Sequence, residues 1–464
     1  MYKTDKIFLI FILPDIFVPK IFIAMTLNVM KFGGTSVGSA ERIKNVLKLV
    51  DDNKPTIVVL SAMSGTTDKL VEINKLINNK DSEGAREIIS LLEKKYYGVV
   101  DELYSSEDAL KNGKKLIKEH FENIRKYLSL NSFSEKEEKE ILAEGELIST
   151  HLFYYLCQEL AKDAALIPAL EFMRIDEYDE PVLNYIRENI KPWIEKNKGS
   201  EIFITQGYIC RNSKGNVDNL KRGGSDYTAT LIGAAIRANE VQIWTDIDGV
   251  HNNDPRFVEN TKPITHLSFD EAAELAYFGA KILHPTCVLP CIRENIPVRL
   301  KNTMDPKAFG TLISNQSSGS GIKAIAAKDG IIAIKIKSTR MLLAYGFLRK
   351  IFEIFEKYRT PIDMITTSEV SVSLTIDNSK YLNEIVDELS HFSSVEVDKD
   401  QTIVCIVGDF ISDNKGMSVQ IFKALENIPI RMISYGGSHH NISLLINTLN
   451  KKEALQSLSK HIFN

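Results

Sequence analysis

The chain has 464 residues, 44% hydrophobic and 25% charged, which is an ordinary globular composition and long enough for two or three domains. The formal net charge is −4, from 57 basic and 61 acidic residues, so nothing favours nucleic acid or an anionic membrane as a partner. The five cysteines are scattered and odd in number, which favours buried thiols over a zinc site and fits a reducing cytoplasm.

The first 24 residues are apolar but interrupted. The longest unbroken apolar run, Ile7 to Leu13, is far shorter than the roughly 20 residues that cross a bilayer. Two lysines precede this run, but no small-x-small cleavage site follows. We therefore expect residues 1–24 to be a non-core extension or an over-called start, and the folded chain to open with the strand after Met25.

From Leu27 to about Leu60 the pattern is strand, glycine loop, helix and strand. The expected helix carries apolar residues at the i, i+3, i+4, i+7 spacing of one helical face, namely Ile43, Val46, Leu47 and Val50. "TIVVL" (56–60) is a short buried run of the kind found in parallel sheets. This order predicts a strand–helix–strand unit.

The loop "KFGGTS" follows the first strand. Lys31 precedes Gly33 and Gly34, which are adjacent, so the loop matches neither GxxxxGK[ST] nor GxGxxG. Glycines let backbone N–H groups approach phosphate oxygens, and Lys31 adds a full positive charge. For this motif alone, a tight turn with a surface lysine is the default interpretation.

Residues 69 to about 160 have helical periodicity and are rich in lysine and glutamate. Strand patterns return at "EIFITQG" (201–207) and "VQIWTD" (241–246). Alternating strands and helices predict an α/β fold with an open, mostly parallel sheet and helices on both faces. Since the polar and glycine-rich loops follow strands, they are expected to meet at one ligand cleft.

A second glycine pair lies in "KRGGSDYTA" (221–229). Arg222 suits a carboxylate, because its guanidinium donates two parallel hydrogen bonds. Asp226 would repel a phosphate unless it orients lysines, and Lys31 and Lys281 are the candidates. An N-capping role for Asp226 is compatible with that function.

Two further motifs have open interpretations. In "GELIST" (145–150), Glu146 could accept a substrate ammonium or could lie on a solvated helix face, and spacing alone does not decide between them. "WTDIDGVHNNDPR" (244–256) resembles part of a calcium loop, but it lacks the twelfth-position Glu and the regular oxygen spacing. A loop at the edge of a nucleotide is the better interpretation.

The sequence pattern changes near residue 313. "SNQSSGSG" (314–321) is a Ser/Gly linker pattern, and an internal repeat follows it. One copy begins at Gly346 and the other at Gly416, and each reads strand, helix, strand, strand, helix. We expect a first domain over 25–313, a linker over 314–328 and a pair of small α+β modules over 329–464.

The motifs together resemble those of aspartate kinases in the amino-acid kinase superfamily. "VMKFGGTSVGS", "LSAMSGTTDKLV", "GELIST", "TQGYI", "RGGSDYTA", "WTDIDGVHNNDPR" and "FGAKILHP" occur in that family's order. The repeat, with "GFL" and "PIDMITTSEVSVSLTID", is similar to the paired, ferredoxin-like ACT domains of these enzymes. The similarity covers Leu27 to Asn464 and is strongest to the monofunctional, lysine-sensitive branch.

The resemblance implies transfer of the γ-phosphoryl group of ATP to the β-carboxylate of aspartate, with Lys31, Asp226 and Lys281 as the catalytic group. The implied ATP-binding residues are Lys31, Phe32, Gly33, Gly34, Thr245, Asp246, His251, Arg256, Lys281 and Ile282. The implied aspartate-binding residues are Thr67, Glu146, Arg222, Gly223, Gly224 and Ser225. His251 stands where the family often has Tyr, and Tyr208 where Phe is frequent.

Cofactors and partners follow from the same resemblance. No carboxylate cluster dedicated to a metal stands out in the sequence, so Mg²⁺ is expected to be carried mainly by the ATP phosphates. The modules imply a homodimer, and whether dimers pair into tetramers stays open. The alternatives are a sister kinase acting on glutamate, acetylglutamate or a nucleotide, and a non-catalytic amino-acid sensor.

The first repeat carries the better candidate pocket for an allosteric amino acid, which the resemblance implies is lysine. Its expected lining is Met341, Ala344, Phe347, Leu348, Asp363, Ser368, Glu369 and Val370. Asp363 and Glu369 would take the two ammonium groups. The second repeat has Arg431 in place of Asp363, which predicts structural pairing rather than binding. Taken alone, the two carboxylates would be assigned to strand ends on a solvated surface.

Overall fold

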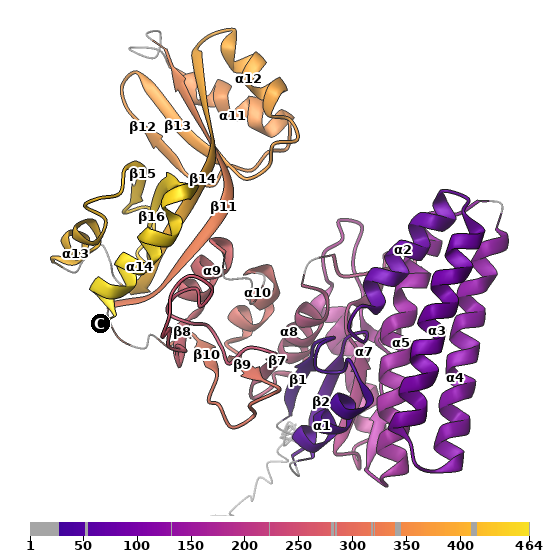
Figure 1. The fold of residues 1–464 in the computed structure, drawn as a ribbon. Helices are drawn as coiled ribbons and strands as arrows, with labels where there is room; N and C mark the ends of the chain where they lie inside the picture. The colour runs from indigo at the N-terminus through magenta and orange to yellow at the C-terminus, as the bar shows by residue number, and fades with distance from the viewer. Residues whose placement is uncertain are drawn as a thin grey trace, which may run out of the picture.

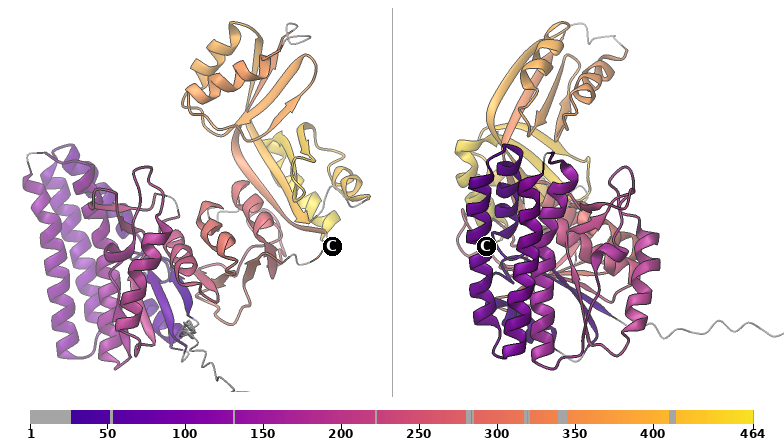
Figure 2. Two further views of the ribbon diagram at one scale, coloured as in Figure 1. Left: turned by 180° about the vertical axis from the view of Figure 1, so that it is seen from behind. Right: turned by 90° about the vertical axis from the view of Figure 1, so that its right-hand side faces the viewer.

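The computed structural model describes residues 27–51, 54–130, 132–221, 223–279, 283, 285–316, 319, 321–338, 345–409 and 415–463. The expected extension over residues 1–24 lies outside this range. The chain forms one large α/β domain and two smaller modules at one end of the molecule, away from the helices α3–α5 (Figures 1 and 2).

The predicted strand–helix–strand unit is confirmed. β1 (Asn28–Phe32) is followed by α1 (Ala40–Val50) and β2 (Thr56–Leu60), and β1 pairs with β2 in parallel. Ser39 begins the helix, because its side chain accepts a hydrogen bond from the Arg42 N–H. The four apolar residues of the predicted helical face are all buried.

The main sheet has eight strands in the order β3-β4-β2-β1-β7-β9-β10-β8. Its other strands are β3 (Ala164–Leu166), β4 (Ile202–Gln206), β7 (Val241–Thr245), β8 (His266–Ser268), β9 (Val298–Asn302) and β10 (Thr311–Ser314). Only the β9–β10 pairing is antiparallel, so the expected open, mostly parallel sheet is confirmed.

Helices cover both faces of this sheet. On one side lie α1 and four long helices: α2 (Thr66–Asn78), α3 (Ser82–Leu103), α4 (Glu107–Lys126) and α5 (Glu135–Glu159). On the other lie α7 (Leu183–Lys196), α8 (Gly224–Ile236) and α10 (Pro285–Glu294), with α7 and α10 each packed against α8. Shorter elements are η1 (Tyr127–Ser129), α6 (Ala169–Phe172), β5 (Ile209–Arg211), β6 (Val217–Asn219) and α9 (Phe269–Tyr277).

The two modules share one six-stranded sheet, ordered β12-β13-β11-β14-β16-β15. Its strands are β11 (Gly321–Lys337), β12 (Ile365–Thr367), β13 (Ser371–Ile376), β14 (Ser394–Asp409), β15 (Ile430–Tyr435) and β16 (Asn441–Asn447). Their helices are α11 (Phe347–Lys357) and α12 (Leu382–Ser390), then α13 (Met417–Ala424) and, after η3 (Thr448–Asn450), α14 (Lys451–Ile462). Both copies have the predicted order of elements.

The long strands β11 and β14 run through both modules (Figure 1). The first half of β11 pairs with the second half of β14 in the second module, and the second half of β11 pairs with β13 in the first. Residues 321–328, placed in the expected linker, are therefore strand. Their apolar residues Ile325 and Ala324 are buried, so the linker expectation is corrected for this half.

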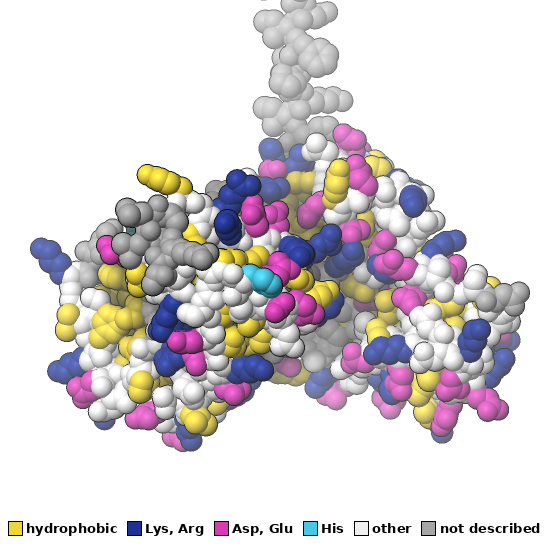
Figure 3. Space-filling model, turned by 90° about the horizontal axis from the view of Figure 1, so that it is seen from above, with side chains coloured by type: hydrophobic (Ala, Val, Ile, Leu, Met, Phe, Trp, Pro, Cys, Tyr) yellow, Lys and Arg dark blue, Asp and Glu magenta, His cyan; other side chains and the backbone are white. Residues whose placement is uncertain are grey.

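Surface charge agrees with the mixed composition. Seen from above, basic and acidic side chains are interspersed over the visible face rather than gathered by sign (Figure 3). In the part of the chain that the structure describes, no helix has both the length and the apolar character to cross a membrane.

Close packing of α8 on the sheet generates a stability prediction. A Cβ on Gly233 would lie 2.3 Å from a methyl of Val241, a buried and stiff side chain. Gly233→Ala should lower the free energy of unfolding by about 1–3 kcal/mol through overpacking. Gly98→Ala is the matched control, because Gly98 is also inside a helix but has nothing within 4 Å of the added Cβ.

In the control Gly98→Ala, the free energy of unfolding should instead rise by up to about 1 kcal/mol, since alanine has a higher helix propensity than glycine. Urea unfolding of both variants measures the difference. Equal effects of the two substitutions would contradict the packing account.

Candidate active site

An ion pair joins the end of β1 to the start of α8. Lys31 Nζ lies 2.6 Å from Asp226 Oδ1, and the two side chains are 12% and 19% exposed. The structure thus brings together two of the three residues expected to form the catalytic group. The third, Lys281, lies outside the described residues, as do Ile282 and Arg222.

The glycine loop after β1 lies directly against the loop after β2. A Cβ on Gly34 would be 2.9 Å from the Ala62 carbonyl, so this approach requires glycine. Gly33 N–H donates to the Trp244 carbonyl at the end of β7. Phe32 is fully buried and stacks on Trp244, so its ring belongs to the core and only its backbone can face a ligand.

The start of α8 approaches the loops after β2 and β4. Gly223 and Gly224 have φ values of 66° and 36°, in the left-handed region that favours glycine, and Gly223 precedes the first residue of α8. Ser61 donates from its hydroxyl to the Ser225 hydroxyl at 2.8 Å. A Cβ on Gly207 would lie 2.3 Å from that hydroxyl, so the close contact depends on glycine there too.

Glu146 is buried beneath the same edge. Glu146 is 3% exposed. Its Oε1 accepts a hydrogen bond from the Ala62 N–H at 3.3 Å, and its Oε2 is buried without a hydrogen-bond partner. Burial raises its pKa to about 8 although the Ala62 N–H opposes the shift. The solvated-helix-face interpretation is therefore wrong. Thr67 is half-buried in the first turn of α2 beside this region.

The loop after β7 lines a separate cavity of about 480 Å³. Of the expected nucleotide residues, the cavity lining includes Asp246, His251 and Arg256, while Thr245 donates to the Asp246 carboxylate. His251 bonds through one ring nitrogen to Asp248 and through the other to Thr261.

Arg256 forms a forked pair with Asp254 at 2.7–3.2 Å. Burial alone would raise the pKa of Asp254, but the hydrogen bonds from Arg256 hold it below its ordinary value. Within the described ranges, no group of three or more His, Cys, Asp or Glu side chains could hold a metal ion.

Within one copy of the chain, the expected effector residues do not form a single pocket. Asp363 lies before β12, and Ser368, Glu369 and Val370 lie in the exposed turn after it, so the two carboxylates occupy opposite ends of an extended strand. Phe347 belongs to the module core, where it packs on Phe392. Leu348 is 39% exposed on α11, and Met341 and Ala344 lie outside the described residues.

Asp363 is neither solvated nor a strand cap. Its side chain is 2% exposed and accepts from Lys328 Nζ at 2.8 Å and from the Tyr277 hydroxyl of α9 at 2.9 Å. Lys328 also pairs with Asp377 at 2.9 Å. Burial lowers the pKa of Lys328, but its two carboxylate partners outweigh burial and raise it.

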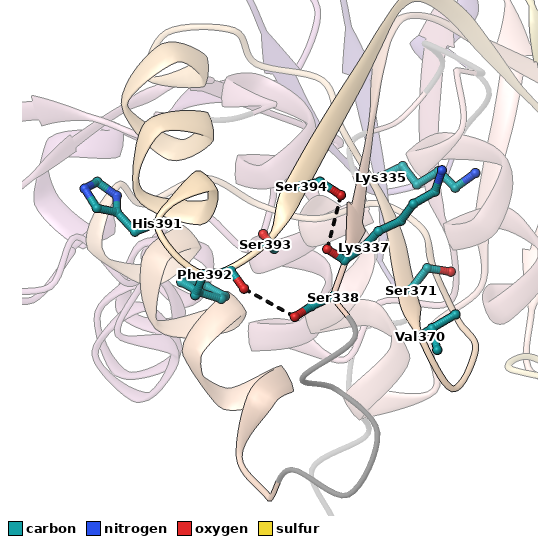
Figure 4. A pocket seen from close by; sticks show the side chains of 9 residues that line it. All are labelled: Lys335, Lys337, Ser338, Val370, Ser371, His391, Phe392, Ser393 and Ser394. Carbon is teal, nitrogen blue, oxygen red and sulfur yellow. Dashed lines mark hydrogen bonds between the residues drawn. The ribbon is translucent and has the colours of Figure 1, made fainter.

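A cavity of about 710 Å³ lies beside this first module (Figure 4). Of the expected effector residues it includes Val370. The other lining residues are Lys335, Lys337, Ser338, Ser371, His391, Phe392, Ser393 and Ser394. Ser338 and Ser394 donate their hydroxyls to the backbone carbonyls of Phe392 and Lys337.

Comparison with known proteins gives the family. Residues 26–302 match the amino acid kinase family, and residues 404–462 match an ACT domain. "Aspartokinase 3, chloroplastic" of Arabidopsis thaliana is 35% identical, over 94% of this chain and 81% of that protein. "Lysine-sensitive aspartokinase 3" of Escherichia coli (strain K12) is 33% identical, over 94% and 99%.

The chain belongs to the amino acid kinase family, among the aspartokinases. Solved structures of family members agree. Escherichia coli aspartokinase III in complex with aspartate and ADP has a TM-score of 0.79 at 32% identity and covers 94% of this chain and 100% of its own. The same enzyme with lysine and aspartate has a TM-score of 0.76 at 32% identity and covers 95% and 100%.

Sequence reasoning did not single out several residues at this family site. Ser61 is one of them, and its position directly after a buried strand is the signal that could have found it. Outside the active site, Lys328 and Tyr277, which hold Asp363, carry no local signal, because their partner is distant in sequence and meets them only in the fold.

Burial of Glu146 predicts a pH-dependent stability. Its native pKa of about 8 lies above the ordinary 4.5, so the native state holds a proton that the unfolded state loses between these values. The free energy of unfolding should therefore fall by on the order of 1.4 kcal/mol per pH unit within this window, relative to Glu146→Gln.

Urea unfolding without aspartate at several pH values between 4.5 and 8 measures the effect. The wild type and the Gln variant should converge below pH 4.5 and diverge as pH rises. Parallel pH profiles for the two proteins would contradict a buried, uncompensated carboxyl.

Proposed function

We propose that this chain catalyses transfer of the γ-phosphoryl group of ATP to the β-carboxylate of L-aspartate, using the loops that meet at the carboxyl ends of β1, β2, β4 and β7. The observation that carries the assignment is the buried Glu146 carboxylate, which has an unpartnered oxygen and bonds through the other to the loop after β2. This loop also contacts Gly34 and, through Ser61, the start of α8. Such a carboxylate suits the ammonium group of a free amino acid.

The amino-acid side of the site uses charges at fixed positions. Glu146 binds the α-ammonium, and Arg222 binds the α-carboxylate through its guanidinium fork. Thr67, Gly223, Gly224 and Ser225 complete the aspartate site with hydroxyl and backbone donors. The ammonium preference of Glu146 disfavours acetylated and nucleotide acceptors.

The nucleotide side uses the neighbouring strand ends. Lys31, the Phe32–Gly34 backbone and Lys281 hold the phosphates, with Ile282 beside Lys281. The nucleoside lies over Thr245, Asp246, His251 and Arg256, in the cavity beyond β7. Mg²⁺ bound to the ATP oxygens neutralises phosphate charge and would be held mainly by those oxygens.

Chemistry requires no general base, because the aspartate β-carboxylate is already ionised and nucleophilic. A carboxylate oxygen forms the new bond to the γ-phosphorus as the bond from that phosphorus to the β,γ-bridging oxygen breaks, giving 4-phospho-aspartate and ADP. This chain contributes in-line positioning and charge neutralisation by Lys31 and Lys281, with Asp226 orienting Lys31.

Control by an end product is part of the proposal. The first module binds lysine, with Asp363, Ser368, Glu369 and Val370 and the Met341–Leu348 segment as its recognition residues. Because Asp363 and Glu369 lie at opposite ends of β12, one ligand would need carboxylates from two copies of the chain. A homodimer through the modules supplies both, and the domain limits 25–313 and 329–464 belong to the same proposal.

Lys31→Ala tests the phosphate role. The variant should fold, since the residue is at a strand end, and its kcat should fall about 10²–10³-fold, as for loss of one transition-state electrostatic contact. A coupled assay of ADP release with aspartate measures it. The same assay with glutamate tests the sister-kinase alternative, and a wild type inactive with both acids would favour the non-catalytic sensor.

Lysine inhibition tests the regulatory role. The wild type should be inhibited by lysine and little by threonine, and Asp363→Ala should lose this inhibition while its uninhibited kcat stays within about twofold, since effector binding acts through two states. Asp377→Ala is the matched control, because it also removes a carboxylate from Lys328 but not the proposed ligand group. Equal lysine inhibition of all three proteins would contradict the assignment.

A further inference from the structure

The loop at the edge of the nucleotide cavity is fastened to the second module. We call residues 246–258 the nucleotide loop. Ile325 N–H in β11 donates to the Asn252 carbonyl at 2.9 Å. Asn253 Nδ2 donates to the Leu455 carbonyl in α14 at 3.0 Å, and Gln456 Nε2 of α14 donates to the Phe257 carbonyl at 3.0 Å. These three hydrogen bonds cross between the catalytic domain and the second module.

The end of the nucleotide loop also belongs to the apolar core of that module. Val258 is 7% exposed and is part of the same buried cluster as Ile325 and Leu455. Phe257 packs against this cluster, and Lys451 Nζ lies 4.3 Å from the centre of its ring. The loop is therefore held by packing as well as by hydrogen bonds.

Asn253 stands at the junction of these contacts. It is 2% exposed, and while its Nδ2 donates to Leu455, its Oδ1 accepts from the Asp254 N–H at 2.8 Å. Asp254 in turn holds the Arg256 guanidinium through its forked pair. A continuous hydrogen-bonded path thus runs from α14 through Asn253 to Arg256, which lines the nucleotide cavity.

The second module also builds the cavity directly. Ile325, Ala326 and Ala327 of β11 line it together with Asp246, His251 and Arg256 of the nucleotide loop. The cavity wall thus includes residues of β11 and of the nucleotide loop, which are far apart in sequence. Displacement of β11 or α14 would change both the shape of the cavity and the position of its arginine.

We propose that the second module is a structural part of the nucleotide site and that Asn253 is a positioning residue, which acts on ATP binding through Asp254 and Arg256. This role rests on the proposed function of the nucleotide loop and differs from effector binding, which belongs to the first module. The second module, which has Arg431 where the first has Asp363, would thus contribute to catalysis without binding a ligand of its own.

Asn253→Ala tests the role in the full-length chain. The variant loses the donor to Leu455 and the acceptor for Asp254, so KM for ATP should rise about tenfold while KM for aspartate stays within about twofold. Asn74→Ala is the matched control, because Asn74 is also buried and donates from Nδ2 to a backbone carbonyl, that of Glu138, within the α2–α5 helices.

The control should lose stability without changing KM for ATP. Titration of ADP into each protein by calorimetry gives the same comparison without turnover, and the Kd for ADP should rise in parallel with KM for ATP. A rise in both KM values together, or the same response from both asparagine variants, would overturn the proposal.

Two exposed glutamines provide a second test and its control, with little risk that either substitution prevents folding. Gln456 and Gln420 are both exposed glutamines of the second module, and each donates from Nε2 to a backbone carbonyl, Gln456 to Phe257 and Gln420 to His461. Gln456→Ala should raise the Kd for ADP about two- to threefold, and Gln420→Ala should leave it unchanged. Equal Kd values for these two variants would also overturn the proposal.

Failure of the underlying function gives a different result. If the wild type binds no ADP and shows no aspartate-dependent release of ADP, the assignment of the nucleotide loop itself is wrong. If the wild type binds and turns over normally but the variants do not separate from their controls, only the role of the second module is wrong.

Discussion

The Lys31–Asp226 ion pair is the interaction on which the site depends. The Lys31 side chain is only 12% exposed, and a largely buried ammonium group requires a partner of opposite charge, because an unpaired buried charge is costly. Asp226 meets this requirement at 2.6 Å, from the first turn of a helix on another segment. The contact forms only because β1 and α8 meet at the carboxyl edge of the sheet. Glycines keep the surrounding elements close: Gly34 lies against the loop after β2, Gly207 against Ser225 of α8, and Gly233 of α8 against Val241 of β7.

The sequence was sufficient for the features that follow from local periodicity. The strand–glycine–helix order, the long helical region and the doubled module all have signals within a few residues of one another. The burial of Glu146 has no such local signal, because the middle of α5 is buried from Ala143 to Thr150 on nearly every side. A helix enclosed by the sheet and by its neighbours α2 and α4 loses the polar face that sequence patterns rely on. Spacing could therefore not separate a buried carboxylate from a solvated one.

The regulatory region shows a second limit. Asp363 and Glu369 are close in sequence, but an extended strand between them carries them apart, and each meets a different environment. Asp363 is neutralised by Lys328 and tied to α9 by Tyr277, contacts formed by residues outside its own repeat copy. Likewise, a Ser/Gly composition predicted a linker where β11 already begins. The strand was missed because its hydrophobic residues alternate with small and charged ones. Long-range pairing with β14 decides the structure there.

These contacts make the modules and the catalytic loops mechanically inseparable. Gly279 has φ 118°, and a Cβ there would lie 2.3 Å from the Ala327 carbonyl of β11, so the chain just before Lys281 touches the strand that enters both modules. Tyr277, two residues earlier, is held by Asp363 of the first module. The nucleotide loop is held by the second module. Through Tyr277, Asp363 is thus tied to the helix that leads to Gly279, and β11 also lines the cavity beside the nucleotide loop. Because close-packed contacts deform little, a shift of the modules would be transmitted to these segments of the catalytic domain.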